Sequence, residues 1–215
     1  MKLRTLSALV ALAMLAVSCD EDVPSGIDLT NFRQDLVSCL HDDGALIFRT
    51  DEGILLYPEE KLSTNLRSAG QRAIIGYVPT TAPKDGEMKI SLETAIRPIP
   101  SAAIIVLPSD SAALLPDDPI YLASVWYGGG CINLRYQIEY YHTLHRLLMV
   151  ALDPQFHSDT LDVRLHYDRA GDAAGYYRSG YASFLLLEPL PANVRVRINT
   201  SNLGGENDFM FTLKQ

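Results

Sequence analysis

The sequence predicts an all-β protein, in which a small OB-like barrel is followed by an antiparallel β-sandwich of about seven strands. Three observations support this prediction. Turn residues interrupt the N-terminal half every few positions, apolar and polar residues alternate over long runs in the C-terminal half, and prolines gather between the two. With 215 residues, 47% of them hydrophobic, the chain is long and apolar enough to bury a sizeable core.

Residues 1–18 are interpreted as an export signal outside the fold. A basic start precedes an apolar run at residues 6–17, which is too short to span a membrane as a stable helix. Residues 15–19, LAVSC, resemble the lipobox of bacterial lipoproteins, in which the cysteine is lipidated and becomes the new N-terminus. We therefore expect a lipoprotein signal peptide and a lipid attached to Cys19. An ordinary secretory signal with an incidental cysteine is the alternative.

Residues 19–34 are expected to form an acidic tether. Asp20, Glu21 and Asp22 follow the cysteine directly, and acids at this place resemble the tag that sends lipoproteins to the outer face of the outer membrane. We expect a lipid-anchored outer-membrane protein exposed at the cell surface, with the periplasmic face as the alternative. The formal net charge is −8, and such a chain repels phosphate backbones, so we expect no nucleic-acid partner.

The first domain is placed at residues 35–117, where short strand-like runs are separated by turns. The expected strands cover residues 35–41, 45–49, 54–57, 73–78 and 88–96. Residues 59–69 tolerate either a short helix or a loop. Five short strands with an irregular insert fit a small Greek-key barrel such as the OB-fold, and a small open β-roll fits nearly as well.

The domain boundary is placed near residue 117, because four prolines lie between residues 99 and 119. Within this stretch, residues 104–107 are able to pair as an edge strand, and residues 109–115 are able to form one helical turn.

The second domain is placed at residues 118–215, where every second residue of several runs is apolar. The alternating runs are residues 132–140, 161–167, 194–198 and 209–213. Residues 120–127 form the opening strand, and residues 181–187 are apolar on both faces, which predicts a central place in a sheet. Residues 144–152 satisfy both strand and helix spacing. About seven strands with polar turns favour a sandwich.

Gly128, Gly129 and Gly130 join two of these strands and precede no helix, so we interpret them as a hairpin turn and not as a phosphate-binding loop. Cys39 and Cys131 lie within strand-like runs of different domains, so we expect two buried thiols without a bridge.

Motifs of the common catalytic classes are absent from the sequence. It contains no nucleophile elbow, P-loop, dinucleotide fingerprint or HExxH helix. His142 and His145 are three apart, which on a strand aims them at opposite faces, so we expect hydrogen-bonded surface histidines and no metal site. Turn chemistry explains Asp168, Asp172 and residues 202–208 without calcium. We predict no catalysis, no cofactor and no bound metal.

Three adjacent aromatic pairs occur at residues 126–127, 140–141 and 176–177. On a strand, one member of each pair faces the core and the other faces out, and we expect Trp126 and Tyr140 to face the core. The outward rings either cover surface or form a platform for a sugar ring or a partner's loop. The candidate ligand or partner surface comprises Trp126, Tyr127, Tyr141, Tyr176 and Tyr177.

Four segments resemble motifs of the NigD-like lipoproteins. They are GQRAII at residues 70–75, DEGILLYP at 51–58, DPI through Trp126 with INL at 132–134, and YRSGYASF with LEPL at 177–190. In order and spacing these segments cover nearly all of the chain after Cys19. The resemblance implies an N-terminal OB-like domain, a C-terminal β-sandwich and a lipid anchor. It implies no activity, since the family takes its name from a bacteriocin gene cluster and its molecular role is not established.

The sequence therefore predicts a non-catalytic interaction or accessory module of the cell envelope with an unknown protein or glycan partner. The alternative is a glycan-binding surface module that uses exposed tyrosines.

Overall fold

Five N-terminal strands close into a barrel, and the later strands form two further sheets. The computed structural model describes residues 29–62, 70–142, 144–152, 159–186 and 188–213. The predicted signal peptide and Cys19 lie outside these ranges, as does most of the stretch at residues 59–69. Residues 31–215 form one compact unit. Within the described ranges, no helix has the length and apolar character needed to cross a membrane.

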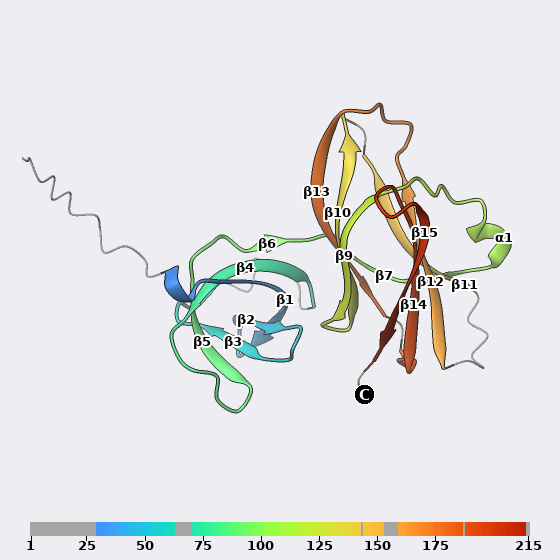
Figure 1. Cartoon of the computed structure of the whole chain (residues 1–215). Helices are drawn as coiled ribbons and strands as arrows, with labels where there is room; N and C mark the ends of the chain where they lie inside the picture. The colour runs from blue at the N-terminus through green and yellow to red at the C-terminus, as the bar shows by residue number, and fades with distance from the viewer. Residues whose placement is uncertain (1–28, 63–69, 143, 153–158, 187, 214–215) are drawn as a thin grey trace, which may run out of the picture. The chain divides into compact units, whose positions relative to one another are not determined.

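The barrel follows a short 3₁₀ helix, η1 (Leu29–Asn31). Its strands are β1 (Arg33–Asp42), β2 (Ala45–Thr50), β3 (Leu55–Pro58), β4 (Arg72–Pro79) and β5 (Glu87–Leu92), and β6 (Arg97–Pro98) adds to β4. The order β1-β2-β3-β5-β4 closes because β4 also pairs with β1, and only β3 and β5 run parallel. Figure 1 shows these strands curling around one another. The predicted OB-like barrel is confirmed.

Turn chemistry and alternation explain the barrel's local structure. Asp43 and Gly44 both have positive φ, 43° and 73°, which is the geometry of a tight type I′ hairpin between β1 and β2. Inward side chains of the described strands form a hydrophobic core. The buried set comprises Val37, Cys39, Leu46, Phe48, Leu56, Ala73, Ile75, Tyr77, Met88 and Ile90. In the described part of the barrel, the interior is occupied by these side chains.

The C-terminal strands form a sandwich of a four-stranded and a five-stranded sheet. The strands are β7 (Ser101–Ala103), β8 (Ile105–Leu107), β9 (Tyr121–Gly128), β10 (Cys131–Tyr140), β11 (Arg146–Leu152), β12 (Thr160–Asp168), β13 (Tyr176–Leu185), β14 (Asn193–Thr200) and β15 (Gly205–Thr212). Their orders are β7-β13-β10-β9 and β15-β14-β12-β11-β8. The seven predicted strands correspond to β9 through β15.

Several details of the strands follow the sequence pattern. The ambiguous stretch at residues 144–152 contains strand β11. Strand β13 lies between β7 and β10, which confirms the central place expected from its apolar residues. The expected helical turn is α1 (Ser109–Ala112).

Three sandwich pairings are parallel, which the alternation alone does not predict. They are β12 with β14, β8 with β11, and β7 with β13. The chain passes from β12 to β13 in the other sheet before it returns to β14, so β14 runs in the same direction as β12.

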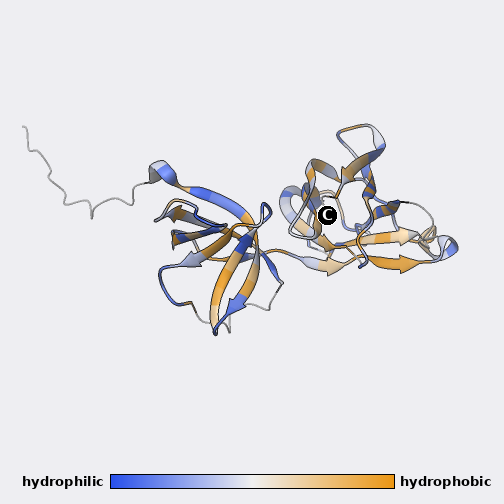
Figure 2. Cartoon of the chain, turned by 90° about the horizontal axis from the view of Figure 1, so that it is seen from below, coloured by the Kyte–Doolittle hydropathy of each residue, from blue (hydrophilic) through white to orange (hydrophobic). Residues whose placement is uncertain are grey.

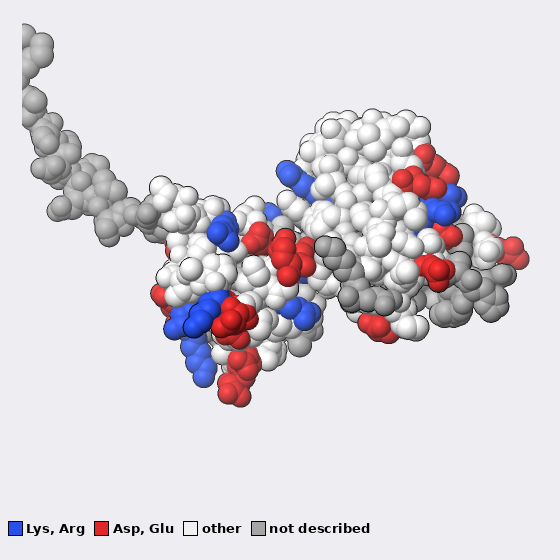
Figure 3. Space-filling view, turned by 60° about the horizontal axis from the view of Figure 1, so that its bottom comes forward, with Lys and Arg blue, Asp and Glu red and all other residues white. Residues whose placement is uncertain are grey.

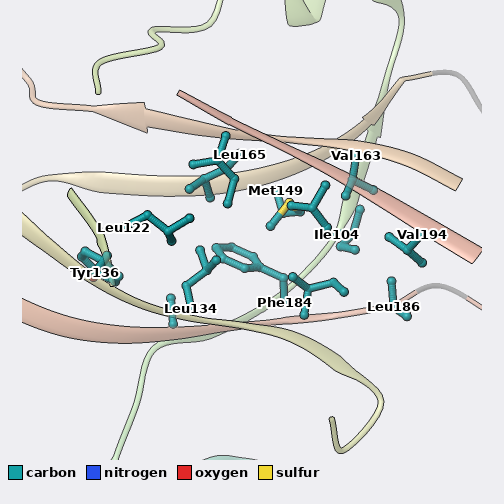
Figure 4. Close-up of a cluster of buried hydrophobic side chains, with 14 of the residues drawn as sticks. Ile104, Leu122, Leu134, Tyr136, Met149, Val163, Leu165, Phe184, Leu186 and Val194 are labelled. Carbon is teal, nitrogen blue, oxygen red and sulfur yellow. The ribbon is translucent and has the colours of Figure 1, made fainter. Parts of the chain in front are cut away.

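The sandwich core lies between the two sheets. Figure 4 shows Leu134 and Phe184 from one sheet facing Met149 and Leu165 from the other. All four are at most 2% exposed, and burial of a side chain of this size stabilises the fold by about 1.5–3 kcal/mol. In Figure 2 the strands carry both hydrophobic and hydrophilic stretches.

The segment at residues 101–107 pairs with strands of the sandwich, although the sequence places it in the first domain. Strand β7 pairs with β13 and β8 pairs with β11, so these three-residue strands lie on different sheets. Ile104 between them is 2% exposed and belongs to the sandwich core. The division of the chain at residue 117 stays a prediction.

Candidate functional site

A cleft of about 780 Å³ lies over one end of strands β10 and β13. Its lining combines arginines, tyrosines and apolar side chains from four sandwich strands with residues from β1 and from the segment at 97–100. The lining residues are Gln34, Arg97, Pro98, Ile99, Pro100, Arg135, Tyr136, Ile138, Tyr140, Leu144, His145, Leu147, Tyr167, Arg178, Ser179, Gly180 and Tyr181.

Three arginines of the cleft lie against tyrosine rings. The guanidinium carbons of Arg97 and Arg135 lie 5.8 and 5.9 Å from the centre of the Tyr181 ring. That of Arg178 lies 5.0 Å from the centre of the Tyr140 ring. Such cation–π contacts hold a guanidinium in place without neutralising its charge.

None of these three arginines forms a salt bridge with a described residue, whereas Arg72, Arg164, Arg169, Arg195 and Arg197 all do. On the face drawn in Figure 3, acidic and basic side chains lie in mixed groups separated by wide uncharged areas. Among the described residues, Arg33, Arg49 and Arg146 likewise form no salt bridge, so the distinguishing feature of Arg97, Arg135 and Arg178 is that they line the same cleft. The cleft is therefore suited to an acidic group.

The strand register places a row of polar and aromatic side chains on the outer face of the four-stranded sheet. The cross-strand partners are Arg135 with Tyr181, Gln137 with Ser179, Glu139 with Tyr177, and Tyr121 with Gln137. These residues face away from the core because their neighbours Leu134, Tyr136 and Ala182 face into it.

Two tyrosines of this row are open to solvent. Tyr177 is 69% exposed and Tyr121 is 43% exposed. The Gln137 side chain donates a hydrogen bond to the Ser179 hydroxyl, at 3.2 Å, between them. We call the surface formed by Tyr121, Arg135, Gln137, Tyr177 and Tyr181 the outer tyrosine face.

The aromatic residues predicted as a binding surface do not come together as one platform. Tyr176 is 60% exposed, and its ring meets Tyr140 edge-on at 5.8 Å. Tyr141 is 59% exposed, and its ring meets His142 edge-on at 4.9 Å. Of the predicted set, Tyr177 alone belongs to the outer tyrosine face. Tyr121 and Tyr181 were not predicted, because their place in this row depends on the strand register.

Trp126 and Tyr127 point in directions opposite to those expected. Tyr127 packs against the sandwich core, and Trp126 lies on the outer face. The cause is a β-bulge in the pairing of β9 with β10, where Arg135 pairs with Ser124 but Tyr136 pairs with Leu122. The extra residue shifts the alternation by one position, which reverses the side of every later side chain.

Trp126 also lies far from the exposed tyrosines. It is level with Asn133 along β10, whereas Tyr177 is level with Glu139. Six residues of strand separate them by roughly 20 Å, so a single small ligand does not contact both.

A buried polar cluster surrounds Trp126. The indole Nε1 donates to Oδ2 of Asp51 at 2.9 Å, and Oδ1 of Asp51 pairs with Arg72. Arg72 is 1% exposed and also donates to the Ser38 hydroxyl at 2.9 Å and to Oδ1 of Asn133 at 3.5 Å. The sequence signal for this cluster is an arginine in an otherwise apolar strand. Because Arg72 is closed to solvent, it is not open to a ligand.

His142 and His145 converge on one carboxylate, contrary to the prediction that they face apart. Nε2 of His145 lies 2.9 Å from Oδ2 of Asp172, and Nδ1 of His142 lies 3.4 Å from Oδ1. The reason is that His142 precedes β11 and has no strand geometry. The Asp172 side chain is fully buried and also accepts the backbone N–H of Tyr141 at 2.9 Å. Asp172 therefore fixes the segment after β10.

The other ring nitrogen of His145 lies 2.5 Å from the hydroxyl of Tyr167, so aspartate, histidine and tyrosine form a hydrogen-bonded chain. Tyr167 is 3% exposed, and desolvation by burial raises its pKa to about 12. A tyrosine that keeps its proton and is closed to solvent is a poor nucleophile or base at neutral pH. These hydrogen bonds therefore have a structural role at the end of the cleft.

The remaining site predictions concern cysteines and metals. Cys39 and Cys131 are both buried and do not form a disulfide with each other. Desolvation raises the pKa of the Cys131 thiol, which keeps it protonated. Among the described residues, no three His, Cys, Asp or Glu side chains are arranged to hold a metal ion.

Comparison with known proteins places the chain among β-sandwich proteins. A family model described as the NigD-like C-terminal beta sandwich domain matches residues 103–213. None of the curated proteins compared with the chain matches it.

Several solved structures share the fold. A protein of unknown function from Bacteroides vulgatus is 18% identical, with a TM-score of 0.72, over 86% of this chain and 92% of that one. A candidate lipoprotein from Bacteroides fragilis is 14% identical, with a TM-score of 0.63, over 86% and 99%. A NigD-like immunity protein from Bacteroides caccae is 16% identical, with a TM-score of 0.59, over 85% and 97%. At these identities the likeness shows the fold alone.

Proposed function

Because the chain belongs to the NigD-like family, we propose that it is a non-catalytic binding module of the cell envelope, tethered by a lipid and acting through the cleft over β10 and β13. One observation carries the binding role: Arg97, Arg135 and Arg178 line one cleft without an acidic partner among the described residues. An acidic segment of a protein partner supplies the missing carboxylates and lets the tyrosine rings pack against its backbone.

The envelope location is supported by the lipobox-like residues 15–19 and by the similar fold of a candidate lipoprotein. We propose attachment through Cys19 and exposure at the outer surface of the outer membrane. The test compares the native chain with Cys19→Ser in cells, by metabolic labelling with an alkyne fatty acid and by surface proteolysis. We expect labelling of the native chain alone. Labelling of the serine variant, or none of the native chain, argues against the anchor.

The protein-binding role is tested by charge reversal. Arg97→Glu combined with Arg135→Glu places repulsive charge in the cleft, while Arg49→Glu with Lys89→Glu makes the same charge change on exposed barrel strands. Cross-linking in intact cells and recovery of the chain should yield the same partner from the native and control proteins. The cleft variant should lose it. Equal recovery by both variants rules out the cleft as the binding site.

A protein partner also agrees with the description of one structural relative as an immunity protein. That description is of the relative, and the binding experiment above decides whether this chain captures a protein.

A glycan-binding role is the second candidate, and Tyr121 and Tyr177 on one sheet face favour it. Exposed rings on a flat sheet face stack against sugar rings, and Gln137 and Arg135 beside them offer hydrogen bonds. A glycan array should lose its signals with Tyr121→Ala plus Tyr177→Ala and keep them with Tyr141→Ala plus Tyr176→Ala. If the signals are lost with Tyr141→Ala plus Tyr176→Ala instead, the sugar binds at Tyr141 and Tyr176.

A further inference from the structure

Both faces of strand β13 contribute to the cleft over β10 and β13. Ser179 and Tyr181 lie on the outer face of the four-stranded sheet. Arg178 and Gly180 lie on the inner face, because they alternate in step with Ala182, which belongs to the sandwich core. Residues 98–100, which lead into β7, also line the cleft. The cleft therefore runs along the edge of β13 that faces away from β10.

Most of this edge has no partner strand among the described residues. Strand β10 pairs with β13 along its whole length, whereas β7 pairs only with residues 183–185. Before β7, the chain turns away to the barrel, where Arg97 and Pro98 pair with β4. Residues 176–182 of β13 therefore have a neighbouring strand on one side only, and the cleft occupies the other side.

Backbone groups of alternate residues point to this open edge. The N–H of Ser183 donates to the carbonyl oxygen of Pro100 at 3.0 Å, on the side away from β10. Backbone groups alternate sides along a strand, and the pairing of β10 with β13 keeps one register throughout. The N–H and C=O groups of Tyr177, Ser179 and Tyr181 therefore point the same way as the N–H of Ser183. Such a row is a template for a further strand.

The charge at this edge selects the kind of strand that it accepts. Residues 176–179 are exposed, and Gly180 and Tyr181 are half-buried. Natural sheets protect open edges with prolines, bulges or charged side chains. Between residues 177 and 181 there is neither a proline nor a bulge, and Arg178 is the only charged residue. A guanidinium opposes basic and apolar strands, but it attracts an acidic one.

The exposed arginines of the cleft lie on both faces of the edge, which fixes the spacing of the acids they attract. Arg97 and Arg135 lie against the outward ring of Tyr181, and Arg178 lies on the inner face. Neighbouring residues on adjacent strands share a face. An acid beside Tyr181 therefore meets the first two arginines, and an acid beside Arg178 meets the third. Because positions 178 and 181 are three apart, the two acids are three apart as well.

We propose that the cleft binds its protein partner by β-strand addition, in which an extended segment with two acidic residues three positions apart pairs with residues 177–181 of β13. This inference rests on the proposed binding role of the cleft and adds the conformation and the acid spacing of the partner. The paired part of the segment is roughly 17 Å long. A second copy of this chain is a poor occupant, because pairing through the same edge brings like charges together.

The experiment begins with random linear peptides displayed on phage and selected on the full mature chain. Enriched peptides should carry two acids three positions apart. A synthetic peptide of the enriched sequence should bind Arg97→Glu plus Arg178→Glu at least about tenfold more weakly than the native chain, measured by fluorescence anisotropy. Arg49→Glu plus Lys89→Glu, on exposed barrel strands, is the control and should bind as the native chain does. Moving one acid by one position should also weaken binding about tenfold, because both acids then lie on one face.

Strand pairing itself is tested on the backbone. Methylation of single amide nitrogens in the peptide should abolish binding at every second position and be tolerated at the positions between, because alternate N–H groups face β13. In the protein, hydrogen exchange of the Ser179 and Tyr181 amides should slow when the peptide binds. The Arg178 and Gly180 amides, which face β10, should not change.

A matched pair of variants tests the same edge. Ser179→Pro removes an N–H that points to the cleft and should abolish binding, whereas Ser179→Ala removes only the hydroxyl and should retain it. Melting temperatures identify a variant that fails to fold. The methylated peptides keep the test valid in that case, because they need no change in the protein.

Three results overturn strand addition. The first is a selection that yields no peptide dependent on the arginines of the cleft. The second is a methylation pattern without alternation, which means that the peptide does not bind as a strand. The third is unchanged exchange of the Ser179 and Tyr181 amides. The cross-linking test in cells depends on the arginines and not on the partner's conformation. Loss of the partner there, with any of these results here, retains the cleft as the binding site and removes only strand addition, whereas equal recovery there overturns both.

Discussion

Trp126 on β9 donates a hydrogen bond from its indole nitrogen to Oδ2 of Asp51, in the turn between β2 and β3, at 2.9 Å. The other oxygen of the same carboxylate pairs with Arg72, which is 1% exposed. One carboxylate thus accepts a hydrogen bond from the only tryptophan and pairs with a buried guanidinium of the barrel.

Replacement of Asp51 by alanine should destabilise the protein by about 3–5 kcal/mol, because it leaves the charge of Arg72 buried without its partner. Urea unfolding followed by Trp126 fluorescence measures this directly. Glu52→Ala, at the exposed neighbouring position, is the control and should lie within about 0.5 kcal/mol of the native chain. A loss below 1 kcal/mol for Asp51→Ala means that the ion pair does not support the fold.

The glycine turn allows a second matched comparison. Gly129 and Gly130 have φ of 60° and 75°, so alanine at either position costs about 1–2 kcal/mol through backbone strain. At Gly129 a Cβ atom would also lie 2.3 Å from Nη1 of Arg72, while at Gly130 its nearest neighbour would lie 4.0 Å away. Gly129→Ala should therefore be clearly the more destabilising in urea unfolding. If both substitutions lower the free energy of unfolding equally, a Cβ atom at position 129 does not clash with Arg72.

Alkaline pH should weaken the fold through Tyr167. Its pKa is raised from 10.0 to about 12, so between these values the folded chain holds a proton that the unfolded chain has lost. The stabilisation is complete below pH 10 and is lost as the pH rises through 12, by about 3 kcal/mol in all.

The free energy of unfolding is measured with urea at several pH values above 10. In Tyr167→Phe this free energy should fall less steeply with pH than in the native chain. The substitution should not abolish the slope with pH, because burial also raises the pKa of Tyr77 and of Tyr136. Tyr121→Phe, at a ring 43% exposed, should leave the slope as in the native chain. If the free energy of unfolding of Tyr167→Phe falls with pH as steeply as that of the native chain, Tyr167 is not a source of the alkaline destabilisation.

The extent of the sandwich is open to a truncation test. A fragment of residues 118–215 lacks β7 and β8, so it exposes the edges of β13 and β11. A fragment of residues 99–215 retains both edge strands. We expect the longer fragment to be monomeric in size-exclusion chromatography and the shorter one to aggregate. If both behave alike, the segment at 101–107 is dispensable for the sandwich.

Alternation and turn residues predicted most of the strands, because each depends on neighbours in sequence. The runs at residues 132–140 and 194–198 have one apolar face and became β10 and β14. Asp43-Gly44 likewise specified a hairpin through its own backbone preferences.

Features that depend on strand pairing were outside the reach of such patterns. The bulge opposite Arg135 and Tyr136 exchanged the sheet faces on which the side chains of Trp126 and Tyr127 lie. No residue type marks this bulge in the sequence. The outer tyrosine face requires knowledge that Tyr121 and Tyr177 flank the same strand. The pocket that α1 and residues 113–117 form with Arg164 and His166 of β12 depends on which face of β12 this segment covers.

The two short strands β7 and β8 also constrain the order in which the parts of the chain fold. Ser101 pairs with Ser183, 82 residues later, whereas every barrel strand lies between Arg33 and Pro98. A chain whose N-terminal part becomes available first is therefore able to complete the barrel early, whereas the sandwich cannot form until β13 is available. During that interval residues 101–107 are without their partners, so the edges of this segment are open to pairing with other chains.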